Sequence, residues 1–104
     1  MGCKFEVGDR VRVREFNDMA EEYGVLRYGS IDPDQSGYVP AFVGSMREYC
    51  GESGTVTNVY KGKGYYEIRV DFDNKKNVIW NFAEYMFEFD TAYELPETTQ
   101  LYGF

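Results

Sequence analysis

Residues 55–72 read TVTNVYKGKGYYEIRVDF, and this stretch decides the fold class. Its last eight residues alternate between two faces, which is the period of a half-buried β-strand. The KGKG sequence at 61–64 is a flexible, glycine-bearing turn between that strand and TVTNVY. One face of the second strand carries Tyr66, Ile68, Val70 and Phe72. The stretch therefore predicts a β-hairpin.

The flanking residues extend this hairpin into a larger sheet. NVIW at 77–80 predicts a third strand of the meander, reached through a turn at DNKK. NFAEYM is short enough to be a single 3₁₀ turn before a last strand, FEF. Near the N-terminus, RVRVR at 10–14 alternates Val with Arg and predicts the first strand.

Between the first strand and the hairpin lies a long excursion, residues 15–53. NDMAEEYG predicts one short helical turn, with Asn17 as N-cap and Gly24 just past the end. PAFVGSMREYCG, residues 40–51, predicts the clearest helix, with Pro40 at its first position and Gly51 as its terminator. Its apolar stripe, expected to pack on the sheet, is Phe42, Val43, Met46, Tyr49 and Cys50.

These elements predict a mainly β fold with one short helix. We expect an SH3-like small five-stranded barrel, with a long helix-containing excursion after the first strand. A closed barrel removes the exposed edges that an open five-stranded sheet would leave. The predicted domain spans residues 1–90, and residues 91–104 form a C-terminal tail that is loosely ordered or docked on it.

Composition limits the classes of partner. The 104 residues carry a formal net charge of −7, whereas phosphate backbones are bound by clustered Lys and Arg. We therefore expect no general nucleic-acid binding, and a protein partner with a basic surface. No apolar run approaches the roughly 20 residues that span a bilayer, and two cysteines do not make a disulfide scaffold. The expected setting is cytoplasmic, without membrane contact.

DPDQSGYV, residues 32–39, begins like a calcium-binding loop. Asp32, Asp34 and Ser36 occupy the first, third and fifth ligand positions. The twelfth position, which should hold a bidentate Glu, is Val43, and the ninth is Pro40. The same residues are typical of a turn, and we expect a turn and no metal site.

Catalysis finds little support in the sequence. The chain has no His, which removes the commonest general base. Cys50 is the only plausible nucleophile, and the negative end of the predicted helix would raise its thiol pKa. Adjacent carboxylates fall on turns or outward faces, where they are solvated. We expect a protein that is not an enzyme and needs no cofactor.

The aromatic residues give the candidate binding site. Ten Tyr exceed what one small core needs, although Trp80 and about half of the Tyr could simply fill it. In an SH3-like barrel the excursion, the hairpin loop and the strand ends flank one groove. The candidate binding residues in those regions are Tyr28, Asp32, Asp34, Tyr38, Tyr60, Tyr65 and Trp80.

Four motifs carry a resemblance to a known group. They are F-x-V-G-D-x-V-x-V at 5–13, F-V-x-x-M-x-x-Y-C-G at 42–51, G-x-V at 54–56 and W-N-F-x-x-x-M-F-E at 80–88. Together they resemble small SH3-like proteins of Gram-positive bacteria and of their phages and mobile elements. The resemblance implies an SH3-like fold and a mobile-element setting, and it implies no catalytic residue.

Three functions compete at this point. The first is a non-enzymatic protein-binding module, which in a phage setting would act as an inhibitor of a host defence or nucleic-acid-handling protein. The second is a small-molecule sponge that holds a nucleotide-like ligand between Tyr and Arg. Its positive contacts would come from Arg10, Arg12, Arg14, Arg27 and Arg69. The third is a structural homo-oligomer formed through the Tyr surface.

Overall fold

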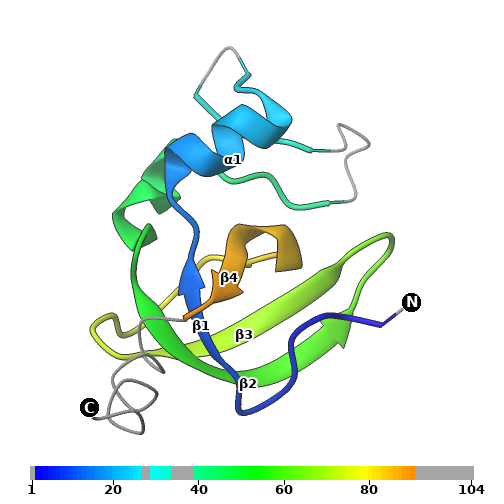
Figure 1. Ribbon diagram of the computed structural model, residues 1–104, viewed down its shortest axis with the longest axis vertical. Helices are drawn as coiled ribbons and strands as arrows, with labels where there is room; N and C mark the ends of the chain where they lie inside the picture. The colour runs from blue at the N-terminus through cyan, green and yellow to red at the C-terminus, as the bar shows by residue number, and fades with distance from the viewer. Residues whose placement is uncertain (1, 27–28, 34–38, 91–104) are drawn as a thin grey trace, which may run out of the picture.

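The computed structural model describes residues 2–26, 29–33 and 39–90. Within these residues the fold is mainly β, with one four-stranded antiparallel sheet and one α-helix (Figure 1). The strands are β1 (Arg10–Val13), β2 (Ser53–Lys61), β3 (Tyr66–Phe72) and β4 (Phe87–Phe89), in the spatial order β3-β2-β1-β4. The predicted first strand, hairpin and last strand are thus confirmed.

The β2–β3 hairpin is the longest paired element, and it curves beneath β1 and β4 in Figure 1. A register shift between Val56 and Asn58 marks an irregularity in β2, the kind of feature that increases strand twist. Gly54 is required in β2, because a Cβ there would lie 2.5 Å from the carbonyl oxygen of Asp71. Ile68 and Phe72 of the predicted inner face are buried.

The prediction of a third meander strand at 77–80 is wrong. Asn77 adopts a left-handed φ of +56°, and the side chain of Ile79 is exposed. A later segment approaches β3 instead: the Ile68 N–H donates to the carbonyl of Phe82 over 2.9 Å, and Glu67 bridges to Ala83. The described residues therefore form a four-stranded sheet, rather than the predicted five-stranded barrel.

The two helical predictions in the excursion are exchanged. The segment predicted as one turn is the α-helix α1 (Phe16–Tyr23), which begins after Glu15, not Asn17, and ends at Gly24 with φ +82°. The segment predicted as the clearest helix contains only a six-residue 3₁₀ helix, η1 (Gly44–Tyr49).

Backbone pairing explains why that helix starts late. Phe42 and Ile31 exchange two backbone hydrogen bonds of 2.8 and 2.9 Å, so Phe42 adopts an extended bridge. Gly51 has φ +84° and follows the helix as predicted. Of the predicted stripe, Phe42, Met46 and Tyr49 are buried in the core, and Val43 and Cys50 pack against it.

An aromatic cluster fills the space inside the sheet. Phe72, Phe82 and Phe87 contact one another with ring centroids 5.5–6.4 Å apart, and Tyr49 adds contacts to Phe72 and Phe82. Phe5, at the entry to the domain, lies 4.9 Å from the ring of Phe89 in β4. These rings supply the apolar area that a small domain with few aliphatic residues needs.

The sheet ends at Asp90, whose backbone N–H donates to the carbonyl of Arg10 over 3.1 Å. The predicted C-terminal tail, residues 91–104, lies outside the described residues. Across the part of the chain that is described, none of the helices has both the length and the apolar composition that crossing a membrane requires.

Candidate functional site

Tyr85 lines two hollows on the surface of the domain. It belongs to η2 (Glu84–Met86), the 3₁₀ turn predicted before β4. Its hydroxyl donates to the carbonyl of Pro40 over 2.8 Å and lies 3.4 Å from that of Ile31. Burial, together with the nearby carboxylate of Asp32, raises the pKa of Tyr85 above its ordinary value. The hydroxyl is therefore a permanent donor that ties the sheet to the excursion.

The first hollow, the aromatic cavity, measures about 240 Å³. Three parts of the chain meet there: the excursion, the tip of the hairpin and η2. The lining residues are Pro33, Val39, Gly64, Tyr65, Tyr66, Ala83, Glu84 and Tyr85.

The hairpin turn positions Tyr65 at this cavity. The Gly62 N–H donates to the carbonyl of Tyr65 over 2.8 Å, which closes the turn. A Cβ on Gly62 would lie 2.5 Å from the Tyr65 ring, so the ring packs directly on the glycine backbone. Gly64 has φ +83°, a conformation that other residues adopt at a cost. The two glycines of KGKG thus allow the turn that positions the Tyr65 ring at the cavity.

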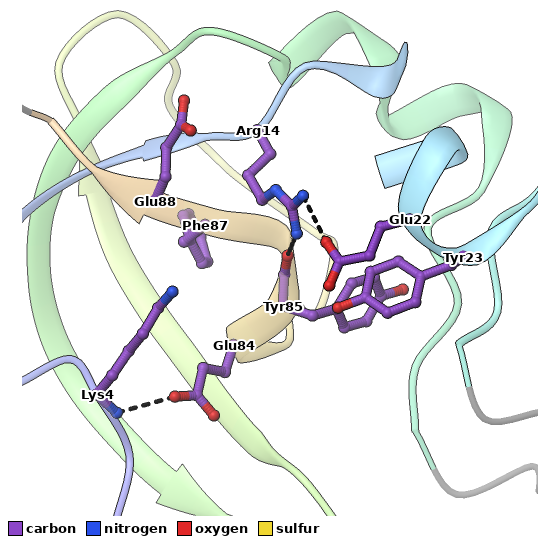
Figure 2. A pocket seen from close by; sticks show the side chains of 8 residues that line it. All are labelled: Lys4, Arg14, Glu22, Tyr23, Glu84, Tyr85, Phe87 and Glu88. Carbon is purple, nitrogen blue, oxygen red and sulfur yellow. Dashed lines mark hydrogen bonds and ion pairs between the residues drawn. The ribbon is translucent and has the colours of Figure 1, made fainter. Parts of the chain in front are cut away.

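The second hollow, the charged cavity, measures about 440 Å³ and shares Glu84 and Tyr85 with the first (Figure 2). It is bordered by α1, the end of β1, β4 and the N-terminal segment. The lining residues are Lys4, Arg14, Glu22, Tyr23, Glu84, Tyr85, Phe87 and Glu88.

Arg14 organises one wall of the charged cavity. Its Nη2 contacts Glu22 Oε1 at 2.7 Å, and its Nη1 donates to the carbonyl of Tyr85 over 3.1 Å (Figure 2). The hydrogen bond from Arg14 lowers the pKa of Glu22. Tyr23 packs edge to face on Tyr85, with ring centroids 5.4 Å apart. Arg14 therefore joins α1 to η2.

Two further carboxylates line the charged cavity, those of Glu84 and Glu88. Glu84 accepts a hydrogen bond from the backbone N–H of Lys4 through Oε2, at 2.8 Å. Glu88 accepts one from Arg12 Nε, also through Oε2, at 3.0 Å. Each of these bonds uses one oxygen of its carboxylate.

The predicted binding residues reach different places. Tyr65 lines the aromatic cavity, and Asp32 lies beside it, next to Pro33. Tyr60 is half-exposed, with the Arg69 guanidinium 5.6 Å from its ring centroid, and Trp80 packs against the core. Neither Tyr60 nor Trp80 lines the two cavities. The remaining predicted residues, Tyr28, Asp34 and Tyr38, lie outside the described part of the chain.

Sequence reasoning missed Tyr23, Tyr66 and Tyr85. A signal for Tyr85 existed, since it lies in the predicted turn at 81–86, between the apolar residues Ala83 and Met86. Ala83 and Met86 of that turn are buried. Tyr85 lies between them in a single 3₁₀ turn, and its hydroxyl reaches the excursion at Pro40.

The arginines proposed to hold a small ligand are engaged with carboxylates. Arg10 makes two hydrogen bonds to Asp73, at 3.0 and 2.6 Å. Arg69 Nε contacts Glu67 at 2.6 Å. Arg12 and Arg14 pair with Glu88 and Glu22 as described above, and Arg27 lies outside the described residues. These four described arginines thus stabilise the surface of the sheet by ion pairing.

A third hollow of about 180 Å³ surrounds Cys50. Burial and the carboxylate of Glu15 raise the pKa of the Cys50 thiol. The direction is the predicted one, but the cause is local burial and not a long helix. In residues 2–26, 29–33 and 39–90, no group of three or more His, Cys, Asp or Glu side chains could hold a metal ion. Asp34 and Ser36 of the calcium-like sequence lie outside these ranges.

Comparison with known proteins gives one match. A family model described as the Mind bomb SH3 repeat domain matches residues 5–83, which is more than half of the chain. Searches of curated proteins and of solved structures returned no match. The matched span includes β1, the excursion and the β2–β3 hairpin. It supports the predicted SH3-like fold.

Proposed function

The chain belongs to the family of Mind bomb SH3 repeat domains, and from this premise we propose that it is a non-enzymatic protein-binding module. SH3-like domains generally bind protein partners, and they often do so through aromatic-lined grooves. The observation that carries the proposal is the aromatic cavity, where three tyrosines converge from the hairpin and η2.

Aromatic residues suit this role physically. Tyr supplies a large contact area with few rotatable bonds, so little conformational entropy is lost on binding. Pro33 and Val39 add apolar surface from the excursion. The cavity therefore fits an apolar side chain of a bound peptide segment.

Charge favours a basic partner. The chain carries a net charge of −7, Glu84 lines the aromatic cavity, and the charge of Asp32 acts on Tyr85 at the same cavity. Opposite charges across an interface speed association more than they increase affinity. Association with such a partner should therefore slow as salt is added.

A narrower form of the proposal is an inhibitor of a host protein, encoded by a phage or mobile element and acting in the cytoplasm. It rests on the resemblance carried by residues 5–13, 42–51, 54–56 and 80–88, together with the acidic charge. A host target that handles nucleic acid would present the basic surface that this charge complements.

The test of the proposal is a selection of binding peptides from a random display library, using the whole chain as bait. Binding of the selected peptides is then measured by titration calorimetry. Val39→Asp, which places a charge in the aromatic cavity, should abolish binding, and Val7→Asp on another exposed surface should leave it unchanged. Equal binding by both variants would contradict the proposed site.

The competing functions predict different results. A small-molecule sponge should carry a bound ligand that appears in the native mass spectrum of freshly purified protein. A structural homo-oligomer should show a multiple of the 12.1 kDa chain mass by light scattering. A monomer without a bound ligand, together with selected peptides, is the outcome that the binding module requires.

A further inference from the structure

We propose that Tyr85 is a positioning residue for the aromatic cavity: its hydroxyl holds the excursion wall of the cavity in place, and a partner segment bound there holds that wall in return. This inference rests on the proposed function and adds its regulation. Occupancy of the cavity and attachment of the excursion to η2 become linked equilibria.

The walls of the aromatic cavity come from two regions of the chain. Pro33 and Val39 belong to the excursion, whereas the hairpin supplies Gly64, Tyr65 and Tyr66. A bound segment that fills the cavity therefore touches both regions at once. Its affinity depends on how the excursion is held against the hairpin and η2.

Tyr85 is fixed on the side of the sheet. Ala83 and Met86, on either side of it in sequence, are buried in the core, and Ala83 bridges to Glu67 in β3. Arg14 Nη1 donates to the carbonyl of Tyr85 over 3.1 Å (Figure 2). The sheet thus sets the position of the Tyr85 hydroxyl, so little ordering is needed when the hydroxyl bonds to the excursion.

The hydroxyl of Tyr85 reaches the excursion at two points beside the cavity. It donates to the carbonyl of Pro40 over 2.8 Å, and Pro40 directly follows the lining residue Val39. It lies 3.4 Å from the carbonyl of Ile31, two residues before the lining residue Pro33. One hydroxyl therefore contacts the chain close to both lining residues of the excursion.

The two arms of the excursion are also joined to each other. Ile31 and Phe42 exchange backbone hydrogen bonds of 2.9 and 2.8 Å, and both residues are buried. The arms therefore meet η2 as one unit, with the Tyr85 hydroxyl at the contact.

This unit has two arrangements that matter for binding. In the attached one the hydroxyl bond is formed and the cavity is complete, and in the detached one Pro33 and Val39 no longer face Tyr65. A segment that touches both walls binds the attached arrangement more tightly. It therefore stabilises attachment by the same free energy by which attachment strengthens binding.

Hydrogen exchange of the whole chain tests this coupling. The probe is the tightest selected peptide whose binding Val39→Asp abolishes, added at a free concentration of about ten times its Kd. The amides of Ile31 and Phe42 pair within the excursion, and neither residue lines the cavity. They should exchange about tenfold more slowly with the peptide, because detachment is suppressed by the factor 1 + [L]/Kd.

Removal of the hydroxyl tests the role of Tyr85. Tyr85→Phe keeps the ring in the cavity but loses the bond to Pro40. Without peptide it should speed exchange at Ile31 and Phe42. It should also weaken the peptide about two- to fivefold, the change that the loss of one neutral hydrogen bond allows when it lowers the attached fraction.

Two control variants remove a hydroxyl elsewhere. Tyr65→Phe changes another lining ring, which packs on Gly62 of the hairpin, and should leave exchange at Ile31 and Phe42 unchanged in the free chain. Tyr60→Phe changes an exposed ring outside both cavities, and should alter neither exchange nor affinity.

The outcomes separate the inference from the proposed function. If the peptide binds but leaves exchange at Ile31 and Phe42 within about twofold of the free chain, the inference is wrong and the binding module stands. Equal affinity of Tyr85→Phe and the natural chain would also overturn the inference. If no selected peptide is sensitive to Val39→Asp, the proposed site fails, and the inference fails with it.

Discussion

The sheet and the excursion of this domain are stabilised by different kinds of interaction. β2 and β3 are joined by a long ladder of backbone pairs with one register shift, and the rings of Phe72, Phe82 and Phe87 pack beneath them. The excursion has a single backbone bridge of its own among the described residues, between Ile31 and Phe42. Buried side chains such as Met19, together with the hydroxyl of Tyr85, fasten it to the sheet.

This difference matters because both cavities lie along the boundary between the two regions. In each cavity, some lining residues belong to the sheet and η2, and others belong to the excursion. The shape of the candidate site therefore depends on the few anchors of the excursion, whereas the stability of the domain depends mainly on the sheet.

The largest expected effect comes from the sheet. Phe72→Ala removes a buried ring that contacts Tyr49, Phe82 and Phe87, and should cost about 3–5 kcal/mol of unfolding free energy. Small domains have only about 5–15 kcal/mol in total. Urea unfolding followed by fluorescence measures the loss. A loss below 1 kcal/mol would show that the sheet is not the stability centre.

A smaller effect is expected where α1 ends. Gly24→Ala places a side chain at φ +82° and ψ 168°, a conformation open almost only to glycine, and should cost about 1–3 kcal/mol. The matched control is Gly44→Ala, which has no atom within 4 Å of the new Cβ and an ordinary φ. Its effect should stay within about 0.5 kcal/mol. The same unfolding measurement compares the two variants.

Removing the hydroxyl that joins the regions should act on the excursion alone. Tyr85→Phe loses the donor to the Pro40 carbonyl, at a cost of about 1 kcal/mol. Hydrogen exchange should then accelerate at the amides of Ile31 and Phe42, which pair within the excursion, and stay unchanged at Val56 in β2. Tyr60→Phe, on an exposed ring, is the control. Uniform acceleration across the sheet would argue against separate anchoring.

The smallest effect is a pH-dependent one at the joint between α1 and β1. The pKa of Glu22 is lowered by Arg14 from its ordinary value of 4.5, so their pair stabilises the fold above about pH 4.5. That contribution disappears as the pH falls through the lowered pKa. Because the pair is exposed, Glu22→Gln should cost no more than about 1 kcal/mol at pH 7.

The same variant should approach the natural protein in stability as the pH falls through the lowered pKa of Glu22, and in about 1 M salt, because Glu22 is then protonated or the pair is screened. Unfolding midpoints across this range give the measurement. A difference that persists in acid would assign the effect of Glu22 to packing and not to charge.

The sequence predicted the sheet well because its signals are local. Alternation in 66–72 and in 10–13, with glycines between the strands, is sufficient to place β1, β2 and β3. The sequence pattern was misleading at 77–80, because alternation does not reveal the left-handed φ of Asn77, at which the chain departs from a strand conformation. It also exchanged the helices, because the pairing of Phe42 with Ile31 is a tertiary contact that no periodicity contains.

The candidate site was predicted by region more than by residue. The prediction that the excursion and the hairpin flank one groove holds for Tyr65 and for the surroundings of Asp32. Tyr60 and Trp80 were named because of their residue type, but one faces solvent and the other packs on the core. Which ring lines a cavity depends on side-chain direction at the boundary, and the anchors that set this direction are not local in sequence.

The place where the chain enters the sheet lies beside the place where it leaves. The Lys4 amide bonds to Glu84, and the ring of Phe5 packs on that of Phe89. A domain with neighbouring ends can be strung head to tail with short connectors, or permuted circularly with new ends opened elsewhere, without disturbing its interior. The tip of the hairpin at 62–64 is an obvious place for such an opening, but it would release Tyr65. This geometry therefore suits concatenation, whereas a permutation opened at 62–64 would disturb the aromatic cavity.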